Sequence, residues 1–226
     1  VQHTAWNVFD VEDIAFLQAK FEAIDFLYIA DGHHRSAAAS RVNVSRSGAG
    51  QSGFFLTVTF PHNQMKILAY NRAVKDLNGL DAESFLEQLE TIFEITEGGA
   101  GGCGTKNELG LYLDGTWRRL VFKTEFAKAD TPMDELDVAL LQNHVLHPML
   151  AIDDPRTSDR VDFIGGIRGV AELERLVDGG DYACAFSMYP TSIEDLMAIA
   201  DAGGIMPPKS TWFEPKLRDA MFCHMI

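Results

Sequence analysis

A β-hairpin is the feature of this sequence that most constrains the fold. Residues 108–123 read ELGLYLDGTWRRLVFK, two strand-like runs joined by Asp114-Gly115, a dipeptide that suits a two-residue turn. Two more runs rich in strand formers, 54–60 and 65–74, flank the turn PHNQ and predict a second hairpin. Because helical and strand-like patterns alternate on both sides of these hairpins, we expect an α+β fold with a mixed sheet, hairpins and flanking helices.

The remaining elements follow from periodicity and from helix-start signals. Apolar residues at helical spacing predict a helix after Asp10, which would be its N-cap, and the run FLYIA at 26–30 predicts a buried strand. Thr131 followed by Pro132 predicts another helix start. The other expected elements are strands at 5–10, 161–165, 182–190 and 219–226, helices at 82–95, 170–177 and 192–202, and a capping box of Thr191 and Glu194.

The sequence contains no internal repeat and no linker long enough to split it. Residues 1–226 are therefore expected to form a single compact α+β region. The chain begins at Val1 rather than at Met, so we expect a fragment of a longer protein that lacks an N-terminal segment. The sequence leaves the oligomeric state open, a homodimer included.

Acidic residues outnumber basic residues by a wide margin. The 226 residues include 33 Asp and Glu against 19 Lys and Arg, so the formal net charge is -14. Such a surface repels nucleic acid and anionic lipid, and we expect neither nucleic acid nor a membrane among the partners. The cysteines have no paired spacing, and no apolar run reaches the roughly 18 residues of a membrane span, which together predict a cytoplasmic protein.

The stretch LYIADGHHRSAAASR, residues 27–41, predicts an anion site. An apolar run stops at Asp31-Gly32 and an alanine-rich helix former follows, so the free N–H groups of a helix start lie beside the turn. Gly32 permits close approach of the backbone, and Arg35 offers a planar fork that suits phosphate oxygens. These residue types at this spacing predict a cradle at 31–36 for the phosphate of a small-molecule ligand.

Each residue of the turn has a functional and a structural interpretation. In the functional one, the phosphate-binding residues are Gly32, Arg35 and Ser36, and the candidate catalytic residues are Asp31, His33 and His34. An aspartate can accept a proton from a hydroxyl or hold magnesium, and histidines can donate to an anion or move protons. In the structural one, the aspartate is only an N-cap, the glycine only a turn residue and the arginine only a surface charge.

The segment LYIADGHHRSAAA resembles the second conserved box of the ParB/sulfiredoxin superfamily, in which a strand leads into a glycine-containing turn that ends in arginine. In that superfamily the turn binds nucleotide phosphates: ParB proteins bind cytidine triphosphate, sulfiredoxins use ATP, and a related ADP-dependent kinase phosphorylates free serine. The resemblance implies that Gly32 and Arg35 bind phosphate. Sulfiredoxins place their catalytic cysteine in this turn, and its absence here argues against sulfinic acid reduction.

A second resemblance covers almost the whole chain. The segments YIADGHHR, LDVALLQNHVLHPMLAIDD and PTSIEDLMAIADAGGIMPPKSTWFEPKL resemble a widespread bacterial family catalogued as domain of unknown function 1015. Members of that family are usually longer and carry another segment ahead of this region, which agrees with the missing Met. The family has no firmly established activity, so the resemblance implies a fold more than a function.

A second candidate phosphate contact lies near the chain end. The stretch PPKSTWFEPK places Lys209, Ser210 and Thr211 after a rigid Pro-Pro, where a charge and two hydroxyls suit a phosphate. The structural alternative is a turn that leads into the last strand. Two glycine-rich stretches fail as nucleotide loops: 98–106 lacks the Lys-Ser/Thr order of a P-loop, and 163–170 lacks the G-x-G-x-x-G spacing.

Metal and thiol chemistry find little support in the sequence. His144 and His147 lie three apart on one expected helix, a spacing that can hold zinc, but no third ligand stands out and no metal site is predicted. Cys103 sits in the glycine-rich loop without a histidine nearby in the sequence, so no catalytic role is assigned to it.

Three functions remain open at this point. The first is phosphoryl transfer from a nucleotide, with magnesium, to a small hydroxylated or amino-acid-like acceptor. The second is a ligand sensor that binds a nucleotide without turnover. The third is a metal-dependent hydrolase that uses Asp31, His33 and His34.

Overall fold

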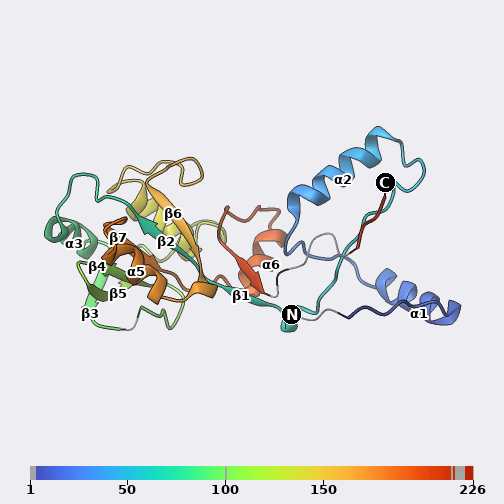
Figure 1. The fold of residues 1–226 in the computed structure, drawn as a ribbon, viewed down its shortest axis with the longest axis horizontal. Helices are drawn as coiled ribbons and strands as arrows, with labels where there is room; N and C mark the ends of the chain where they lie inside the picture. Colours follow the sequence, from blue (N-terminus) through green and yellow to red (C-terminus); the bar gives the residue numbers. More distant parts are fainter. Residues whose placement is uncertain (1–3, 100, 215, 217–221, 226) are drawn as a thin grey trace. The chain divides into compact units, whose positions relative to one another are not determined.

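The computed structural model describes residues 4–99, 101–214, 216 and 222–225, and the chain consists of two compact units (Figure 1). The smaller unit is Val1–Phe55 and the larger unit is Leu56–Met225. The expectation of one compact region over 1–226 stays a prediction. No helix within the described ranges combines the length and the apolar character that crossing a membrane requires.

The smaller unit contains two helices, α1 (Val11–Glu22) and α2 (His33–Ser45). The predicted N-cap is confirmed, because the Asp10 carboxylate accepts from the N–H of Glu12 at 2.9 Å and from that of Asp13 at 3.2 Å.

The predictions of two strands in the smaller unit are wrong. Residues 5–10 and 26–30 are extended but form no strand, and FLYIA is not buried, since Phe26 is 63% exposed. A strand needs a neighbour for its N–H and C=O groups, and the described part of this unit contains no strand to pair with.

The larger unit is built on a six-stranded antiparallel sheet with the order β3-β5-β4-β7-β2-β6 (Figure 1). The strands are β2 (Tyr70–Val74), β3 (Phe93–Glu97), β4 (Glu108–Leu113), β5 (Thr116–Phe122), β6 (Val161–Gly165) and β7 (Cys184–Ser187). The α+β class is confirmed. Every strand pair between described residues is antiparallel, whereas a mixed sheet was expected.

The predicted hairpin at 108–123 is confirmed as β4 and β5. Asp114 and Gly115 both have positive φ, 49° and 69°, as a two-residue hairpin turn requires. The register pairs Leu113 with Thr116 and Tyr112 with Trp117.

The predicted hairpin of 54–60 with 65–74 is wrong. Residues 54–60 form no strand, and the second run divides at Ala69 into β1 (Lys66–Leu68) and β2. Strand β1 pairs with β8 (Trp212–Glu214), which sequence reasoning did not anticipate, while β2 pairs with β6 and β7. Each half of the run therefore pairs with strands much farther along the chain than residues 54–60. Of the expected strand at 219–226, residues 219–221 and 226 lie outside the described residues and the rest is not a strand.

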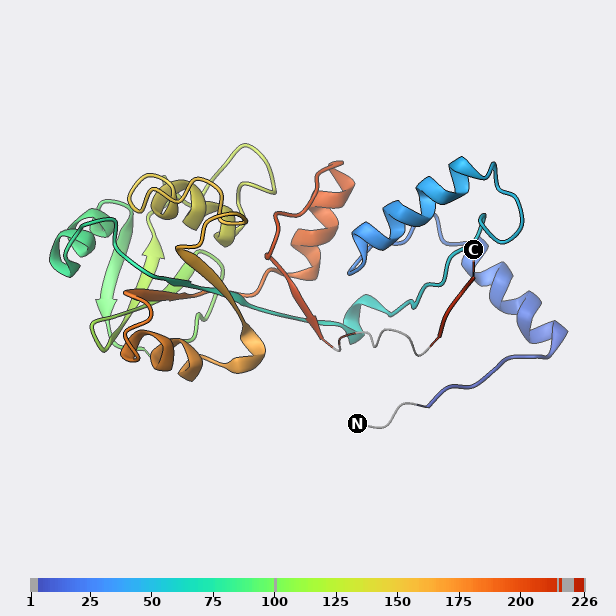
Figure 2. The same cartoon turned by 45° about the horizontal axis from the view of Figure 1, so that its top comes forward.

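Helices cover both faces of the six-stranded sheet. The helices of the larger unit are α3 (Ala82–Glu90), α4 (Asp137–Leu141) continued by the π-helical turn η2 (Gln142–Leu146), α5 (Ala171–Asp178) and α6 (Ile193–Asp201). The unit also contains the 3-10 turns η1 (His62–Gln64) and η3 (Gly166–Arg168). One core cluster contains Leu111 with α3 and α4, and the other contains Tyr112 with α5, as the alternation of side chains along a strand requires. In Figure 2, the olive α4 and the orange α5 lie on opposite sides of the strands.

Three helix boundaries differ from expectation. Helix α3 ends at Glu90, and β3 takes up the rest of 82–95. Thr131 caps a turn through the N–H of Asp134 at 3.2 Å, and the helix after it begins only at Asp137. The predicted capping box is shifted by one residue and consists of Ser192 and Asp195.

Candidate functional site

The predicted phosphate turn lies in the smaller unit, at the start of α2. Gly32 is the N-cap, with φ 92° and ψ 25°, in the left-handed region that L side chains rarely adopt. The N–H of Ser36 donates to the carbonyl oxygen of Gly32 at 2.9 Å and closes the first helical turn. The chain therefore enters the helix at a position that strongly favours glycine.

The Arg35 side chain folds back onto this glycine. A Cβ placed on Gly32 would lie 3.1 Å from Arg35 Nη2, 3.2 Å from Nε and 3.4 Å from Cζ. This is the direction in which helical side chains lean, toward the N-terminus of their helix. The first turn of α2 contains no acidic residue, and the helix dipole adds partial positive charge there. Arg35 and the dipole together favour a negative charge at the helix start.

The predicted catalytic residues lie on either side of Gly32. Asp31 precedes it, and His33 and His34 are the first two residues of α2, all three with exposed side chains. The structural interpretation of Asp31 as the N-cap is wrong, because Gly32 is the N-cap and no side-chain hydrogen bond caps the helix among the described residues. The N-cap residue itself thus has no side chain that could compete with an anion for the helix N–H groups.

The second predicted group, Lys209, Ser210 and Thr211, lies in the larger unit, in the loop between α6 and β8. Ser210 is buried, and its Oγ donates to the carbonyl oxygen of Pro207 at 2.6 Å. The carbonyl oxygen of Ser210 accepts from Thr191 Oγ1 at 3.2 Å. Ser210 thus holds the loop, which belongs to a different unit from the 31–36 turn.

Lys209 is the charged member of this loop. It is exposed and has φ 58°, an uncommon conformation for a residue other than glycine. Its Nζ lies 5.6 Å from the centroid of the Tyr70 ring, a cation–π distance.

Sequence reasoning missed Arg72, which contacts the same loop from β2. Arg72 is only 4% exposed, and burial lowers its pKa to about 9. Its Nη2 donates to the carbonyl oxygen of Lys209 at 3.1 Å, and its Cζ lies 5.2 Å from the centroid of the Phe163 ring. The sequence did contain a sign of this buried arginine, because Arg72 is the single charged residue in YNRAV, a run whose other members suit a buried strand.

A buried polar cluster fixes the end of the glycine-rich loop. The N–H of Asn107 donates to Asp137 Oδ1 at 2.9 Å, and burial raises the pKa of Asp137 to about 6. Among the described residues, Asp137 Oδ2 and Asn107 Oδ1 are buried without a hydrogen-bond partner. Cys103 Sγ donates to the carbonyl oxygen of Ser187 at 3.1 Å, and burial raises its pKa to about 11. The thiol is therefore protonated at neutral pH and is a poor nucleophile.

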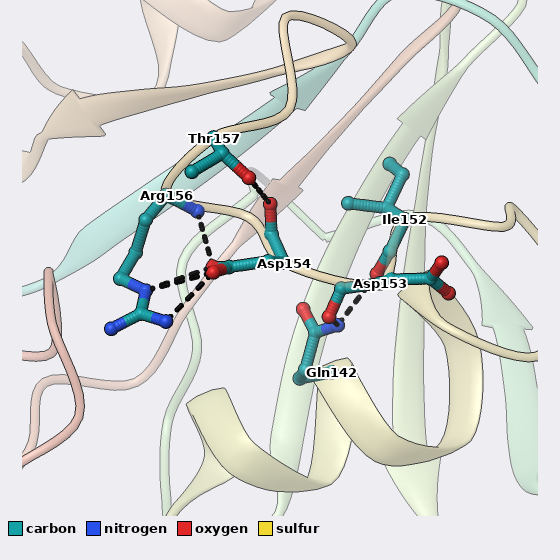
Figure 3. Close-up of polar contacts among 6 residues, drawn as sticks. All are labelled: Gln142, Ile152, Asp153, Asp154, Arg156 and Thr157. Atoms are coloured by element: carbon teal, nitrogen blue, oxygen red, sulfur yellow. Dashed lines mark hydrogen bonds and ion pairs between the residues drawn. The ribbon is translucent and has the colours of Figure 1, made fainter.

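Polar side chains also fix the loop at 152–157 (Figure 3). Gln142 Nε2 donates to the carbonyl oxygen of Ile152 at 2.7 Å. Arg156 Nε and Nη2 donate to the Asp154 carboxylate at 2.9 and 2.7 Å, and these bonds lower the pKa of Asp154 to about 2. Since these groups bind one another, we interpret them as supports of the loop.

The two histidines considered for zinc have different partners. The rings of His144 and Phe126 have centroids 5.3 Å apart, and His147 Nδ1 lies 2.9 Å from Asp153 Oδ1. Nowhere in the described part of the chain do three or more His, Cys, Asp or Glu side chains form a group that could hold a metal ion.

Two solved structures that resemble the chain are a free serine kinase in complex with AMP and a conserved hypothetical protein from Pyrococcus furiosus. The kinase is 15% identical, with 92% of this chain and 81% of the kinase covered and a TM-score of 0.49. The second protein is 17% identical, with 84% and 71% covered and a TM-score of 0.45. Both TM-scores are below 0.5, so the assignment of the 31–36 turn and of the 209–211 loop as candidate sites depends on the contacts within this chain. No functionally curated protein matches the sequence.

A family model described as "Protein of unknown function (DUF1015)" matches residues 1–139. The matched range includes YIADGHHR and therefore the turn at 31–36. It confirms the family resemblance drawn from the sequence, whereas the likeness of the turn to the ParB/sulfiredoxin superfamily stays a prediction. Because the match covers more than half of the chain, the chain belongs to this family of proteins of unknown function.

Proposed function

We propose that the chain binds the phosphate groups of a nucleotide or phosphorylated metabolite at the 31–36 turn and transfers a phosphoryl group to a small hydroxylated acceptor. One observation carries the proposal: the Arg35 guanidinium lies against Gly32, at the N-terminus of a helix that has no side-chain cap among the described residues. A guanidinium fork and helix N–H groups at one place are donors that suit phosphate oxygens.

The other residues of the turn supply the functional groups that phosphoryl transfer needs. Phosphoryl transfer is catalysed mainly by positioning and by neutralising charge, with a base that accepts the hydroxyl proton. Asp31, His33 and His34 are the proposed source of that base, and their exposed side chains leave room for an acceptor. Magnesium would arrive with the nucleotide and neutralise phosphate charge, with Asp31 as its proposed ligand.

A thermal-shift panel of the whole chain with AMP, ADP and inorganic phosphate, each with and without magnesium, tests the proposal. Binding to the folded state raises the free energy of unfolding by RT ln(1 + [L]/Kd), and the midpoint temperature rises with it. AMP and ADP are the first nucleotides to try because similar solved structures are named as complexes with them. We expect at least one of the three to raise the midpoint, and no rise with any of them at millimolar concentration would contradict the proposal.

Turnover separates an enzyme from a sensor. Once the nucleotide that binds is known, it is incubated with the chain and with amino acids or sugars as acceptors. We expect transfer of a phosphoryl group to a hydroxyl of one acceptor, and phosphorus NMR detects it as a loss of the nucleotide signal. Binding without transfer to any acceptor would leave the phosphate site in place and make the chain a ligand sensor.

A further inference from the structure

The Arg72 guanidinium is buried, and its sequence neighbours on β2 carry no carboxylate. Its Nη1 donates to the carbonyl oxygen of Tyr70 and its Nη2 to that of Lys209, and Phe163 covers its face. Among the described residues, no Asp or Glu forms an ion pair with it. These two carbonyl oxygens accept from its N–H groups, but they do not neutralise its charge.

The half-buried Arg118 likewise donates to carbonyl oxygens, those of Leu113 and Thr116, whereas other arginines of the larger unit have carboxylate partners. Arg119 pairs with Glu108 at 2.7 Å, and Arg160 pairs with Asp76. The chain has 33 acidic residues against 19 basic ones, so carboxylates are in good supply. A buried charge that is left uncompensated destabilises the fold, and such groups are found at functional sites more often than elsewhere. Arg72 therefore calls for an explanation beyond stability.

A second positive charge is held beside the first. Lys209, whose carbonyl oxygen bonds to Arg72, has the left-handed φ of 58° and an exposed side chain. Its Nζ stands over the Tyr70 ring, which also meets Phe163 and Trp212 edge to face at 6.1 and 5.4 Å. Strained backbone that is held by surrounding bonds is typical of ligand-binding positions. The bonds here come from Arg72 and from the Thr191 contact to the next residue of the loop.

The carboxylate of β8 is already engaged by its own strand and by the chain just after it. Glu214 of β8 accepts from Trp212 Nε1 at 2.7 Å through one oxygen and from the N–H of Lys216 at 3.3 Å through the other. Lys216 places Nζ 5.1 Å from the centroid of the Trp212 ring, a cation–π distance. Arg72 and the Lys209 loop that it contacts thus bring two positive charges into one region of a chain of net charge -14.

We propose that Lys209, held in place by the buried Arg72, binds the oxyanion of a small ligand, a phosphate or a carboxylate, at a site of the larger unit that works without the 31–36 turn. Lys209 contacts the ligand. Arg72 is a positioning residue, because it is buried and acts by fixing the Lys209 backbone and by adding positive charge behind it. An anion at this place supplies the counter-charge that no Asp or Glu among the described residues gives to Arg72. The inference goes beyond the proposed function and does not depend on it.

The test is made in an Arg35→Ala background, which removes the strongest donor of the turn. Titration calorimetry with inorganic phosphate and with succinate compares Lys209→Asn with Lys128→Asn, an exposed lysine elsewhere in the larger unit. Asparagine tolerates left-handed backbone, so Lys209→Asn removes the charge and spares the loop. We expect affinity for at least one anion to fall about tenfold in Lys209→Asn and to stay unchanged in Lys128→Asn. Loss with phosphate only, or with succinate only, identifies the ligand class; equal affinity of the two variants for both anions overturns the proposal.

The role of Arg72 is tested separately with Arg72→Met and Arg72→Lys. Circular dichroism gives the folded fraction of each variant, so that anion affinities are compared at equal folded fraction. We expect Arg72→Lys, which keeps the positive charge, to bind the anion more tightly than Arg72→Met. A purely structural role predicts that each folded variant binds as the parent does, and that result contradicts the positioning role. Should neither variant fold, the Lys209→Asn comparison decides the proposal by itself.

Discussion

The Arg35 guanidinium lies against the Cα of Gly32 at the first turn of α2. A Cβ on Gly32 would come within 3.1 Å of Arg35 Nη2, and the residue has φ 92°. The left-handed backbone therefore favours glycine at position 32, and a side chain there would press on the arginine fork at the helix start. The Gly32–Arg35 contact links the conformation of the turn to the charge of the proposed phosphate site.

Gly32→Ala is expected to weaken both the turn and the site. The left-handed backbone costs an alanine about 1 kcal/mol relative to glycine. The new methyl group also presses on the Arg35 guanidinium, which must shift by a few tenths of an ångström, so affinity for the best phosphate ligand should fall, as measured by calorimetry.

Gly50→Ala is the matched control for that substitution. Gly50 also has a positive φ, 65°, but a Cβ there would meet nothing within 4 Å. It shares the backbone cost and leaves Arg35 in place, so its ligand affinity should equal that of the parent. Equal losses of affinity in the two variants would show that the Gly32–Arg35 contact is irrelevant to binding.

Asp137 should make stability depend on pH. Burial raises its pKa from 3.8 to about 6, so the folded state holds this proton more tightly than the unfolded state. Its contribution to stability is fully present below pH 3.8 and is lost as the pH rises through about 6. Between pH 5 and pH 7 the loss amounts to roughly 1 kcal/mol.

Asp137→Asn removes this titration and keeps an oxygen that can accept from the N–H of Asn107. Urea unfolding of parent and variant at pH 5 and pH 7 isolates the effect, because all other carboxylates titrate in both proteins. We expect the variant to gain roughly 1 kcal/mol on the parent between pH 5 and pH 7. Parallel pH profiles would show that Asp137 titrates in its ordinary range.

Gly165→Ala should destabilise the larger unit by overpacking. A Cβ there would lie 2.5 Å from Trp212 Cζ3 and 2.6 Å from Cε3, so the indole of β8 must move. Such overpacking costs about 1–3 kcal/mol. Gly102→Ala, where a Cβ meets nothing within 4 Å, is the control and should change the free energy of unfolding by less than about 0.5 kcal/mol. Equal unfolding free energies for the two variants would mean that Trp212 does not pack on Gly165.

The absence of a nucleic-acid partner stays a prediction from charge. With a formal net charge of -14, we expect no mobility shift of random duplex DNA at low salt below high micromolar protein. Tight binding that weakens with added salt would refute it.

Sequence patterns predicted the elements whose partners are close along the chain. The hairpin at 108–123 was readable because its turn dipeptide and both strands are adjacent. The strands at 54–60 and 26–30 were wrong because short apolar runs can be exposed extended chain as easily as strands, and the choice depends on a distant partner. Strand β8 was missed for the same reason, since its partner β1 lies more than a hundred residues earlier.

The candidate sites divide in the same way. Gly32 and Arg35 could be predicted because a glycine turn and a helix start are local features. Arg72 could not, because its burial depends on strands and a loop that are distant in the sequence, and one arginine in a short strand carries no periodic signal. The hydroxyl of Ser210 was predicted to meet a phosphate, but the loop geometry directs it to a carbonyl oxygen.

Calorimetric titration of the parent, Arg35→Ala and Arg41→Ala with ADP and magnesium tests the central claim most directly. Arg41 is exposed on the same helix and controls for the loss of one positive charge. Removing a charge-assisted donor costs about 1.5–3 kcal/mol, so Arg35→Ala should weaken binding by roughly 10- to 150-fold, whereas Arg41→Ala should bind like the parent. Unchanged ADP affinity in Arg35→Ala, or an equal loss in both variants, would contradict a phosphate site at the 31–36 turn.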